Sequence, residues 1–354
     1  MSAASPDLID LYSDTQTRPT PGMRAAMAQA VVGDEQSGDD PTTLELCGRV
    51  AGLLGMEAGV FLPSGTMCNL IGILTHTRPG DELICDHQSH IYGTEAAGAA
   101  AIAGVSIRAI ISPHGIFGVQ QVEEAVRPVS RTAPRSRLLS AEQTTNFSGG
   151  AVWPLAELQA VRDVAQQHGL KCHLDGARLL NASAASGVSP ADYAAGWDSA
   201  WIDLSKGLGC PVGAVLCGSA AFVEDAWQWK YRLGGAMRQS GVLAAAGVYA
   251  LDHHLEGLRA DHENAQAIWG VLSGCELFQF DPPQPASNIL RFTFDPSTIG
   301  AEAFAAGCLT QGVRVRSIGG NFIRVTTHLD VSASETESAA QTMLSVALAL
   351  AEGV

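Results

Sequence analysis

Lysine is nearly absent from this chain of 354 residues, which contains only Lys171, Lys206 and Lys230. Arginine supplies the rest of the 21 basic residues, against 36 acidic residues and a formal net charge of −15. An acidic surface of this kind repels polyphosphates, so we expect no nucleic-acid partner. A sequence with so little lysine is expected to keep each one for a particular purpose.

Charged residues and long apolar runs are also scarce. Charged residues make up 16% of the chain and hydrophobic residues 46%, which is typical of a well-buried globular protein and excludes a disordered one. No apolar run approaches the ~18–20 residues of a membrane-spanning helix, so we expect no membrane partner. The first ten residues lack the basic-then-apolar pattern of a signal peptide, and we expect a cytoplasmic protein.

Metal-binding patterns are weak as well. The eight cysteines form no C-x-x-C pair, which argues against a zinc knuckle or a dithiol redox motif. Cys217 ends an apolar run and is expected to be a small buried hydrophobe. His87 and His90 have the spacing of a ligand pair, but no third ligand is evident. We therefore expect no metal, and favour a buried histidine or a ring stacked on a cofactor.

Strand and helix signals alternate between about Pro21 and Cys217, which predicts a mostly parallel sheet covered by helices on both faces. The predicted strands are 59–62, 83–85, 105–111, 136–139, 171–174, 199–204 and 213–217, and the predicted helices include 21–30, 66–76 and 155–168. Ligands bind such sheets at the carboxyl ends of the strands, so the loops after the strands are candidate sites.

The pattern changes after Arg238. The predicted helices are then 241–258, 261–272, 300–309 and 334–350, and the predicted strands are 287–294, 313–316 and 321–326. This is the size of an independent α+β unit. We predict an α/β fold with an N-terminal arm (1–16), a large domain (17–252) and a smaller C-terminal α+β domain (253–354).

Two ionisable residues follow predicted strands. Lys206 precedes two glycines, and a lysine so placed can form a Schiff base with a carbonyl cofactor, although most lysines are only solvated surface groups. Asp175 could form a structural ion pair with Arg178, or it could hold the protonated ring nitrogen of pyridoxal phosphate. The residues alone leave both pairs of alternatives open.

The segment Ser64–Thr66 follows a predicted strand and opens a predicted helix. Free backbone N–H groups and two hydroxyls at a helix N-terminus suit a phosphate, although Ser-Gly-Thr is also an ordinary capped turn. The chain has neither a nucleotide P-loop nor a G-x-G-x-x-G dinucleotide motif.

Seven segments together resemble one known family. They are DLYSDTQTRP (10–19), GDDPT (38–42), FLPSGT (61–66), HLDGAR (173–178), LSKGLG (204–209), GGAMRQSG (234–241) and TTHLD (326–330). In this order, and spread nearly from end to end, they resemble the L-threonine aldolase family. That family belongs to the fold-type-I, aspartate-aminotransferase-like enzymes, which use pyridoxal phosphate.

The resemblance implies the residues that bind the cofactor ring. Lys206 is then the Schiff-base lysine and Asp175 the partner of the pyridine nitrogen. Arg178 lies beside the phenolic oxygen, and His90 stacks on the ring. We therefore expect Lys206, His90 and Asp175 to be catalytic.

The resemblance also implies how the phosphate is held. Ser64, Gly65 and Thr66 bind it from the helix N-terminus, and Arg238 reaches it from an adjacent subunit. The expected assembly is a homodimer or a homotetramer with active sites shared across the interface.

For the amino-acid substrate, the resemblance implies a set of five residues. Ser13 and Arg324 bind the carboxylate, for which the arginine fork offers two parallel hydrogen bonds. Glu95, Thr145 and Arg178 complete the expected substrate site.

The sequence departs from the family pattern at three positions, one of which belongs to this set. Thr145 stands where a histidine is associated with the substrate's β-hydroxyl, Thr94 where an aromatic residue is common, and Tyr231 where a lysine is common. Threonine cannot act as a base near neutral pH, so His90 is the expected base. Thr145 is also smaller than histidine, and we expect a preference for a β-hydroxy amino acid other than threonine.

The implied activity is cleavage of the Cα–Cβ bond of a β-hydroxy-α-amino acid, of the threonine, allo-threonine or phenylserine type, to glycine and an aldehyde. The alternative is a β-eliminating lyase or dehydratase that begins with loss of the Cα proton. A cofactor-binding regulator is a third possibility, but the chain has no basic patch for DNA.

Overall fold

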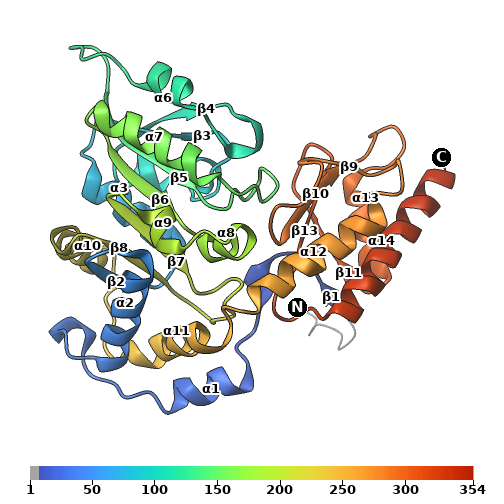
Figure 1. Cartoon of the computed structure of the whole chain (residues 1–354), viewed down its shortest axis with the longest axis horizontal. Helices are drawn as coiled ribbons and strands as arrows, with labels where there is room; N and C mark the ends of the chain where they lie inside the picture. The colour runs from blue at the N-terminus through green and yellow to red at the C-terminus, as the bar shows by residue number, and fades with distance from the viewer. Residues whose placement is uncertain (1–7, 354) are drawn as a thin grey trace.

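The protein is described from a computed structural model, in which residues 8–353 are placed (Figure 1). Residues 1–7 of the predicted N-terminal arm lie outside the described part of the chain. Two lobes lie side by side: a larger one built on a wide sheet, and a smaller one that contains the C-terminal helices.

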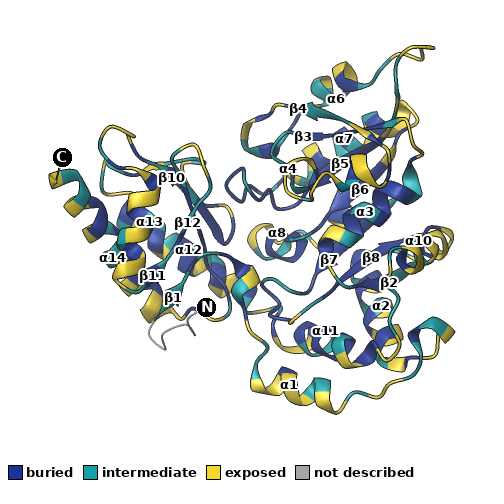
Figure 2. Cartoon of the chain, turned by 180° about the vertical axis from the view of Figure 1, so that it is seen from behind, coloured by how far each residue is buried: buried dark blue, intermediate teal, exposed yellow. Residues whose placement is uncertain are grey.

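A seven-stranded sheet forms the centre of the larger lobe, with strand order β2-β8-β7-β6-β5-β3-β4. Strand β8 runs antiparallel to both its neighbours, β2 and β7, and the other four strand pairs are parallel, so the predicted mostly parallel sheet is confirmed. The strands are β2 (Ala58–Leu62), β3 (Asp81–Asp86), β4 (Ser106–Ile110), β5 (Arg135–Glu142), β6 (Lys171–Asp175), β7 (Ser199–Asp203) and β8 (Ala214–Gly218). Every residue of β7 and β8 is buried, which is why these strands read as continuous apolar runs (Figure 2).

Helices cover both faces of this sheet. The helices α3, α5 and α10 pack together on one face, and α2, α6, α7 and α9 pack on the other. The bounds are α1 (Pro21–Ala28), α2 (Pro41–Leu54), α3 (Gly65–His76), α4 (His90–Gly93), α5 (Gly98–Ala101), α6 (Val119–Ala125), α7 (Leu155–Gln167), α8 (Leu179–Ser186), α9 (Pro190–Ala194), α10 (Ala220–Arg232) and α11 (Gly241–His253), with the 3-10 turns η1 (Asp14–Gln16), η2 (Glu35–Ser37) and η3 (Pro113–Gly115).

The smaller lobe packs a four-stranded antiparallel sheet, ordered β12-β13-β10-β9, against three helices. Its elements are α12 (Leu258–Leu272), β9 (Gln279–Phe280), β10 (Ile289–Thr293), α13 (Ala301–Thr310), β11 (Val313–Arg314), β12 (Arg316–Ser317), β13 (Phe322–Thr326) and α14 (Ala333–Glu352). The N-terminal strand β1 (Ile9–Asp10) pairs in parallel with β11, so the start of the described chain belongs structurally to this lobe.

Each lobe has its own hydrophobic core. The main core of the larger lobe runs from Met23 to Leu258, and that of the smaller lobe runs from Ala265 to Ala347 and also includes Leu11. Helix α12 therefore contributes to both cores. The domain boundary at residue 252 remains a prediction.

Two predicted elements differ from the observed ones. The helix predicted for 241–258 ends at His253, because His254 leaves the helix and its ring bonds the carbonyl oxygen of Leu208 at 2.8 Å. The strand predicted for 313–316 is two short strands, β11 and β12, which belong to different sheets. No helix in residues 8–353 is long and apolar enough to cross a membrane.

Candidate functional site

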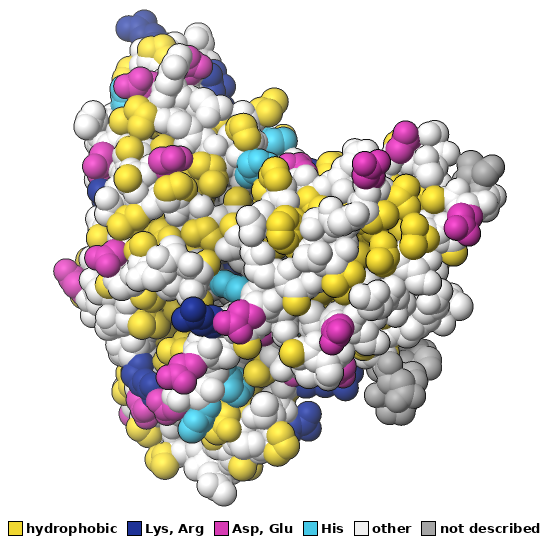
Figure 3. Space-filling model, turned by 45° about the vertical axis from the view of Figure 1, so that its right-hand side comes forward, with side chains coloured by type: hydrophobic (Ala, Val, Ile, Leu, Met, Phe, Trp, Pro, Cys, Tyr) yellow, Lys and Arg dark blue, Asp and Glu magenta, His cyan; other side chains and the backbone are white. Residues whose placement is uncertain are grey.

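The candidate site lies where the carboxyl ends of three parallel strands face the small-lobe sheet. Acidic residues end each of these strands: Glu142 ends β5, Asp175 ends β6 and Asp203 ends β7. The expected site residues gather around them. Figure 3 shows a notch between the two lobes, with histidine side chains at its edge.

Lys206 lies in the loop that follows β7, with its side chain 17% exposed. Its Nζ atom is 2.9 Å from Oδ2 of Asp203 and lies over the ring of Trp201 at 5.6 Å. The Lys206 carbonyl oxygen accepts hydrogen bonds from the Thr17 hydroxyl at 2.8 Å and from the Gly209 amide at 2.8 Å. These contacts fix the backbone and leave the amine at the edge of the site.

Asp175 is buried, and no cation pairs with it in the described part of the chain. The sequence allowed a structural ion pair between Asp175 and Arg178, but Arg178 is bonded to Asp14. Instead, Oδ2 of Asp175 accepts from Asn69 Nδ2 at 2.8 Å, and Oδ1 accepts from the Ala177 amide at 3.1 Å. A buried carboxylate with only neutral donors is suited to a cationic N–H from a ligand.

Asn69 connects Asp175 to the histidine side of the site. Its Nδ2 also donates to Oε1 of Glu95 at 2.7 Å, and its Oδ1 bonds Trp201 Nε1 at 2.8 Å and the buried ring of His173 at 3.1 Å. All the hydrogen-bonding capacity of this buried amide is used, which holds Asp175 and Glu95 in fixed positions.

His90 is the first residue of α4, and its Nδ1 atom is 2.7 Å from Oε1 of Glu95. Because that carboxylate accepts, Nδ1 carries the proton and Nε2 is left as the basic atom. Burial lowers the pKa of His90, but the hydrogen bond to Glu95 and the charge of Asp175 outweigh it, so the pKa lies above its ordinary value. Burial and the charge of Asp175 also raise the pKa of Glu142, to about 7.

The predicted phosphate turn is the N-terminus of α3. Ser64 caps the helix, since its hydroxyl accepts from the Met67 amide at 3.2 Å. The first N–H groups of a helix have no acceptor inside the helix, so those of Gly65 and Thr66 are available to an anion. A Cβ on Gly65 would lie 2.3 Å from the Trp201 ring, so this close approach requires glycine.

Arg178 forms a buried two-point ion pair with Asp14. Its Nε and Nη2 atoms lie 2.6 and 2.7 Å from the two carboxylate oxygens. Burial raises the pKa of Asp14, but Arg178 outweighs it and holds that pKa well below its usual range. The pair is therefore charged, and it ties the N-terminal segment to the larger lobe.

Arg324 is 1% exposed and has no acidic partner within residues 8–353. Its Nη1 donates to Asn146 Oδ1 at 2.6 Å and its Nη2 to the Tyr12 carbonyl at 3.2 Å, while its Nε has no partner. Burial, and then the positive charge of Arg178, lower the pKa of Arg324 to about 9. Because of this cost of burial, the guanidinium is suited to a carboxylate supplied from outside the chain.

Ser13 and Thr145 are both buried close to these groups. The Ser13 hydroxyl oxygen lies 3.4 Å from Oδ1 of Asp14. The Thr145 hydroxyl accepts from the Ala151 amide at 3.0 Å, and a Cβ on Gly115 would lie 2.9 Å from the Thr145 methyl group. The loop's own backbone therefore uses the Thr145 hydroxyl as an acceptor and leaves its O–H to donate, and a substrate role for both residues stays a prediction.

From the local sequence Trp227–Lys230 we expect Lys230 on a solvated helix face, and this prediction is wrong. Its side chain is fully buried, pairs with Glu35 and lies 4.2 Å from the Trp227 ring centroid. Glu35 also accepts from the Met237 amide at 2.8 Å. The ion pair neutralises the ammonium inside the protein, so Lys230 has a structural purpose, whereas Lys171 is 54% exposed and bonds Asp198.

Arg238 lies apart from the other predicted residues. Its side chain is 61% exposed and pairs with Asp34 at 2.8 Å. No group of three or more His, Cys, Asp or Glu residues in the described chain is placed to hold a metal ion.

Sequence reasoning missed five residues that build the site: Asp14, Asn69, Glu142, Asn146 and Asp203. The strand-end argument that selected Asp175 applies equally to Glu142 and Asp203, so these two could have been found. Asp14 and Asn146 lie beside predicted residues in the sequence. Only Asn69 could not have been selected from the sequence, because a single polar residue within the largely apolar helix α3 does not indicate a site.

Comparisons with known proteins show the family to which the chain belongs. The sequence model of the β-eliminating lyase family matches residues 10–294. The low specificity L-threonine aldolase of Escherichia coli is 38% identical over 92% of this chain and 95% of that protein. An uncharacterized protein of Caenorhabditis elegans is 42% identical, and the match covers 73% of this chain but only 63% of that protein's length.

Solved structures confirm the fold. A threonine aldolase from Leishmania major superposes with a TM-score of 0.82 at 22% identity, covering 96% of this chain and 99% of that one. A serine palmitoyltransferase from S. paucimobilis with bound pyridoxal phosphate and myriocin gives 0.77 at 16% identity, covering 97% and 88%. With its fold type and lyase class thus confirmed, the chain belongs to the threonine aldolase family of pyridoxal-phosphate-dependent lyases.

Proposed function

We propose that this lyase is an aldolase that cleaves the Cα–Cβ bond of a β-hydroxy-α-amino acid to glycine and an aldehyde. The observation that carries the proposal is Arg324, a buried guanidinium without an acidic partner, close to the site that contains Lys206 and Asp175. The names of the threonine aldolase relatives support the same reaction.

The residues present fit pyridoxal phosphate. Lys206 supplies the amine, Asp175 the unpaired carboxylate for a ring N–H, and the N-terminus of α3 the phosphate donors. His90 supplies a ring to stack on the cofactor, and Arg178 supplies a charged neighbour. When bound, the cofactor accepts the electron pair of the bond that breaks.

The protein's own groups select which bond breaks. Arg324 binds the substrate carboxylate with its fork, and Ser13 adds a hydroxyl, so the amino acid is held in one orientation. Arg178 is not free to bind the substrate with two nitrogens in the same way, because Asp14 holds its Nε and Nη2 atoms. Its contribution is to position Asn146, which both arginines contact through the same oxygen.

The proton of the β-hydroxyl requires a base, and we assign this role to Nε2 of His90. Glu95 fixes the tautomer through Nδ1, and Asn69 fixes Glu95. Thr145 has its hydroxyl bound by the Ala151 amide and takes no part in proton transfer.

The assembly we propose is a homodimer or a homotetramer of a cytoplasmic enzyme. Arg238 is exposed, and it lies next to a surface with apolar side chains: Val31 is 70% exposed and Leu44 is 54% exposed. A second copy of the chain on this surface would cover these residues. In such a dimer, Arg238 of one subunit would reach the cofactor phosphate of the other.

The reaction is tested by product analysis of the purified holoenzyme with threonine, allo-threonine, phenylserine and 3-hydroxyaspartate. We expect stoichiometric glycine and aldehyde from at least one of them. The second candidate function, β-elimination, is favoured by the family model that matches residues 10–294, and it would give ammonia and a keto acid instead. The two sets of products share no compound, so one assay separates the functions.

Replacing Glu95 by glutamine should shift the pH dependence of cleavage. Glu95 raises the pKa of His90, and glutamine keeps the hydrogen-bond acceptor but removes the charge. The base must be neutral, so activity falls as the pH drops through the pKa of His90. We therefore expect the acid limb of kcat/KM to move to lower pH, with a plateau lowered by about tenfold or less, because a weaker base remains.

Glu263→Gln is a matched control, since Glu263 is an exposed glutamate on helix α12 that takes no part in the site. The measurement is the kcat/KM profile of both variants with one substrate. An acid limb that stays in place in Glu95→Gln would show that His90 is not the base.

A further inference from the structure

A cavity of about 320 Å³ opens between the His90 loop and the small-lobe sheet. Its wall comes from the segment 87–94, from Phe147, and from the small-lobe sheet, which contributes Arg291 and Phe322. Ser89 directly precedes the proposed base, and Phe147 directly follows the Asn146 that binds Arg324. The cavity is therefore placed to receive whatever group extends from the β-carbon of a substrate held by Arg324.

Arg291 is the cationic residue of this cavity. Its side chain is 10% exposed, and its buried Nε atom has no hydrogen-bond partner. Its nearest acid is Asp281, 3.3 Å from Nη2, but Asp281 is 43% exposed and also lies 3.4 Å from His114. Burial lowers the pKa of Arg291, and Asp281 only partly opposes this. The buried guanidinium lacks a full counter-charge.

Three arginines form a row across the small-lobe sheet. Arg291 on β10 and Arg316 on β12 are the direct cross-strand partners of Arg324 on β13, so all three project from the same face. Arg316 has no acidic partner within residues 8–353 and lies over the rings of Tyr12 and Phe147, at 5.1 and 5.8 Å. One substrate carboxylate compensates Arg324, but it leaves Arg316 without an acidic partner in the described chain and Arg291, which lies over the Phe322 ring at 4.0 Å, with only the half-exposed Asp281.

The cavity wall contains no acidic residue. Its other polar groups are donors or neutral: the Gln88 carbonyl is occupied by the Ser148 hydroxyl at 2.8 Å, which leaves the Gln88 amide N–H groups, and His87 lies 3.4 Å from Asp86. Gly93 and Thr94 are small, so the wall beside them is open. In a chain with a net charge of −15, an acid-free cavity next to three arginines is a marked local reversal of charge.

We propose that the preferred substrate carries a second carboxylate on its β-carbon side, bound in this cavity by Arg291 within the field of Arg316. The inference rests on the proposed aldolase function and names its substrate class, the β-hydroxy-α-amino dicarboxylic acids. For 3-hydroxyaspartate, the Cα–Cβ bond breaks, the β-hydroxyl loses its proton and Cα gains one. The products are glycine and glyoxylate, and no oxidant or other reactant is needed.

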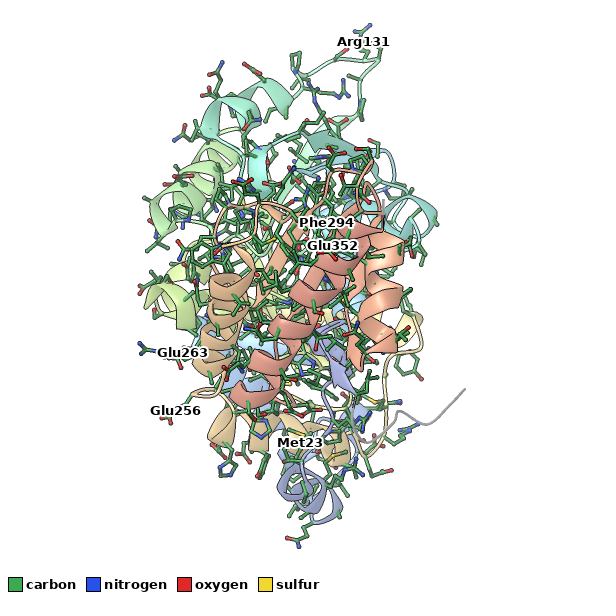
Figure 4. All side chains as sticks on the ribbon, turned by 90° about the vertical axis from the view of Figure 1, so that its right-hand side faces the viewer. Met23, Arg131, Glu256, Glu263, Phe294 and Glu352 are labelled. Atoms are coloured by element: carbon green, nitrogen blue, oxygen red, sulfur yellow. The ribbon has the colours of Figure 1, made fainter. Side chains whose placement is uncertain are left out.

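The test compares 3-hydroxyaspartate with 3-hydroxyasparagine, which has the same shape without the charge. We expect kcat/KM of the wild-type holoenzyme to favour the acid by at least about tenfold, since a buried guanidinium pairs with a carboxylate more strongly than with an amide. In Arg291→Gln this ratio should fall to about one, while kcat/KM for threonine changes less than about threefold. Arg259→Gln is the control: Arg259 is 80% exposed and pairs with Glu263, which is labelled on the outer side of α12 in Figure 4.

A binding measurement separates this inference from the proposed function. L-aspartate and L-asparagine lack the β-hydroxyl and cannot be cleaved, and calorimetric titration of the holoenzyme gives their Kd values. We expect aspartate to bind at least about tenfold more tightly, and Arg291→Gln to remove the difference. Equal binding of the two, or a wild-type preference for the amide, overturns the inference even if glycine is formed from threonine. Absence of glycine from every substrate overturns the aldolase function, and the aspartate result then still decides whether the cavity selects anions.

Discussion

Lys206→Ala should fold normally and lose at least about a thousandfold in kcat, the scale of losing a covalent catalytic group. The variant removes the amine that attaches the cofactor. Its neighbour Asp203 keeps two other partners, the Ser205 amide and hydroxyl, both at 2.8 Å, so the carboxylate is not left without hydrogen bonds. The fold should therefore survive the substitution.

The measurement is borohydride reduction of the holoenzyme followed by peptide mapping, together with kcat for the variant. With three lysines in the chain, the mapping is a complete test. Lys171→Ala is the control, because Lys171 is exposed and pairs only with Asp198. Attachment of the cofactor to Lys171 or Lys230 would disprove the assignment.

Arg324→Ala should raise KM for the amino acid by roughly 30- to 4,000-fold, the equivalent of about 2–5 kcal/mol for breaking a buried charge pair. The effect should be much smaller on kcat, because Arg324 binds a group that does not react. Arg324→Lys keeps the charge but loses the two-point fork, so we expect an intermediate KM.

The same substitution should behave unusually in thermal unfolding. Burial lowers the pKa of Arg324 to about 9, so its charge is unfavourable in the free enzyme. Removing it should leave Tm unchanged or raise it, despite the loss of the bonds to Asn146 and Tyr12. A clear fall in Tm with an unchanged KM would mean that Arg324 serves the fold and not the substrate.

The sequence was sufficient to predict the position of residues that lie at or just after the ends of strands; their roles stay predictions. Lys206 and Asp175 come directly after apolar runs, and parallel strands bring such positions to one edge. The alternation of apolar runs with helical segments likewise predicts the larger lobe, since strands buried on both faces leave a clear local pattern.

Residues that act through distant partners could not be predicted in this way. Asn69 bonds Asp175 across 106 positions of sequence, and Arg178 bonds Asp14 across 164. Lys230 reads as a surface residue because its partner Glu35 lies 195 positions away in another segment. Local pattern carries no information on such pairs, which arise only when the lobes and loops pack.

The scarcity of lysine has a practical consequence for attaching the enzyme to a surface. Of its three lysine side chains, Lys230 is buried and Lys206 is inside the site, so Lys171 is the one lysine side chain that an amine-reactive support would readily reach. Lys171 begins β6 and Asp175 ends it, which separates them by about 13 Å along the strand. Enzyme molecules coupled through Lys171 would be attached at the amino ends of the strands. The site lies at the carboxyl ends, so its entrance would face the solution.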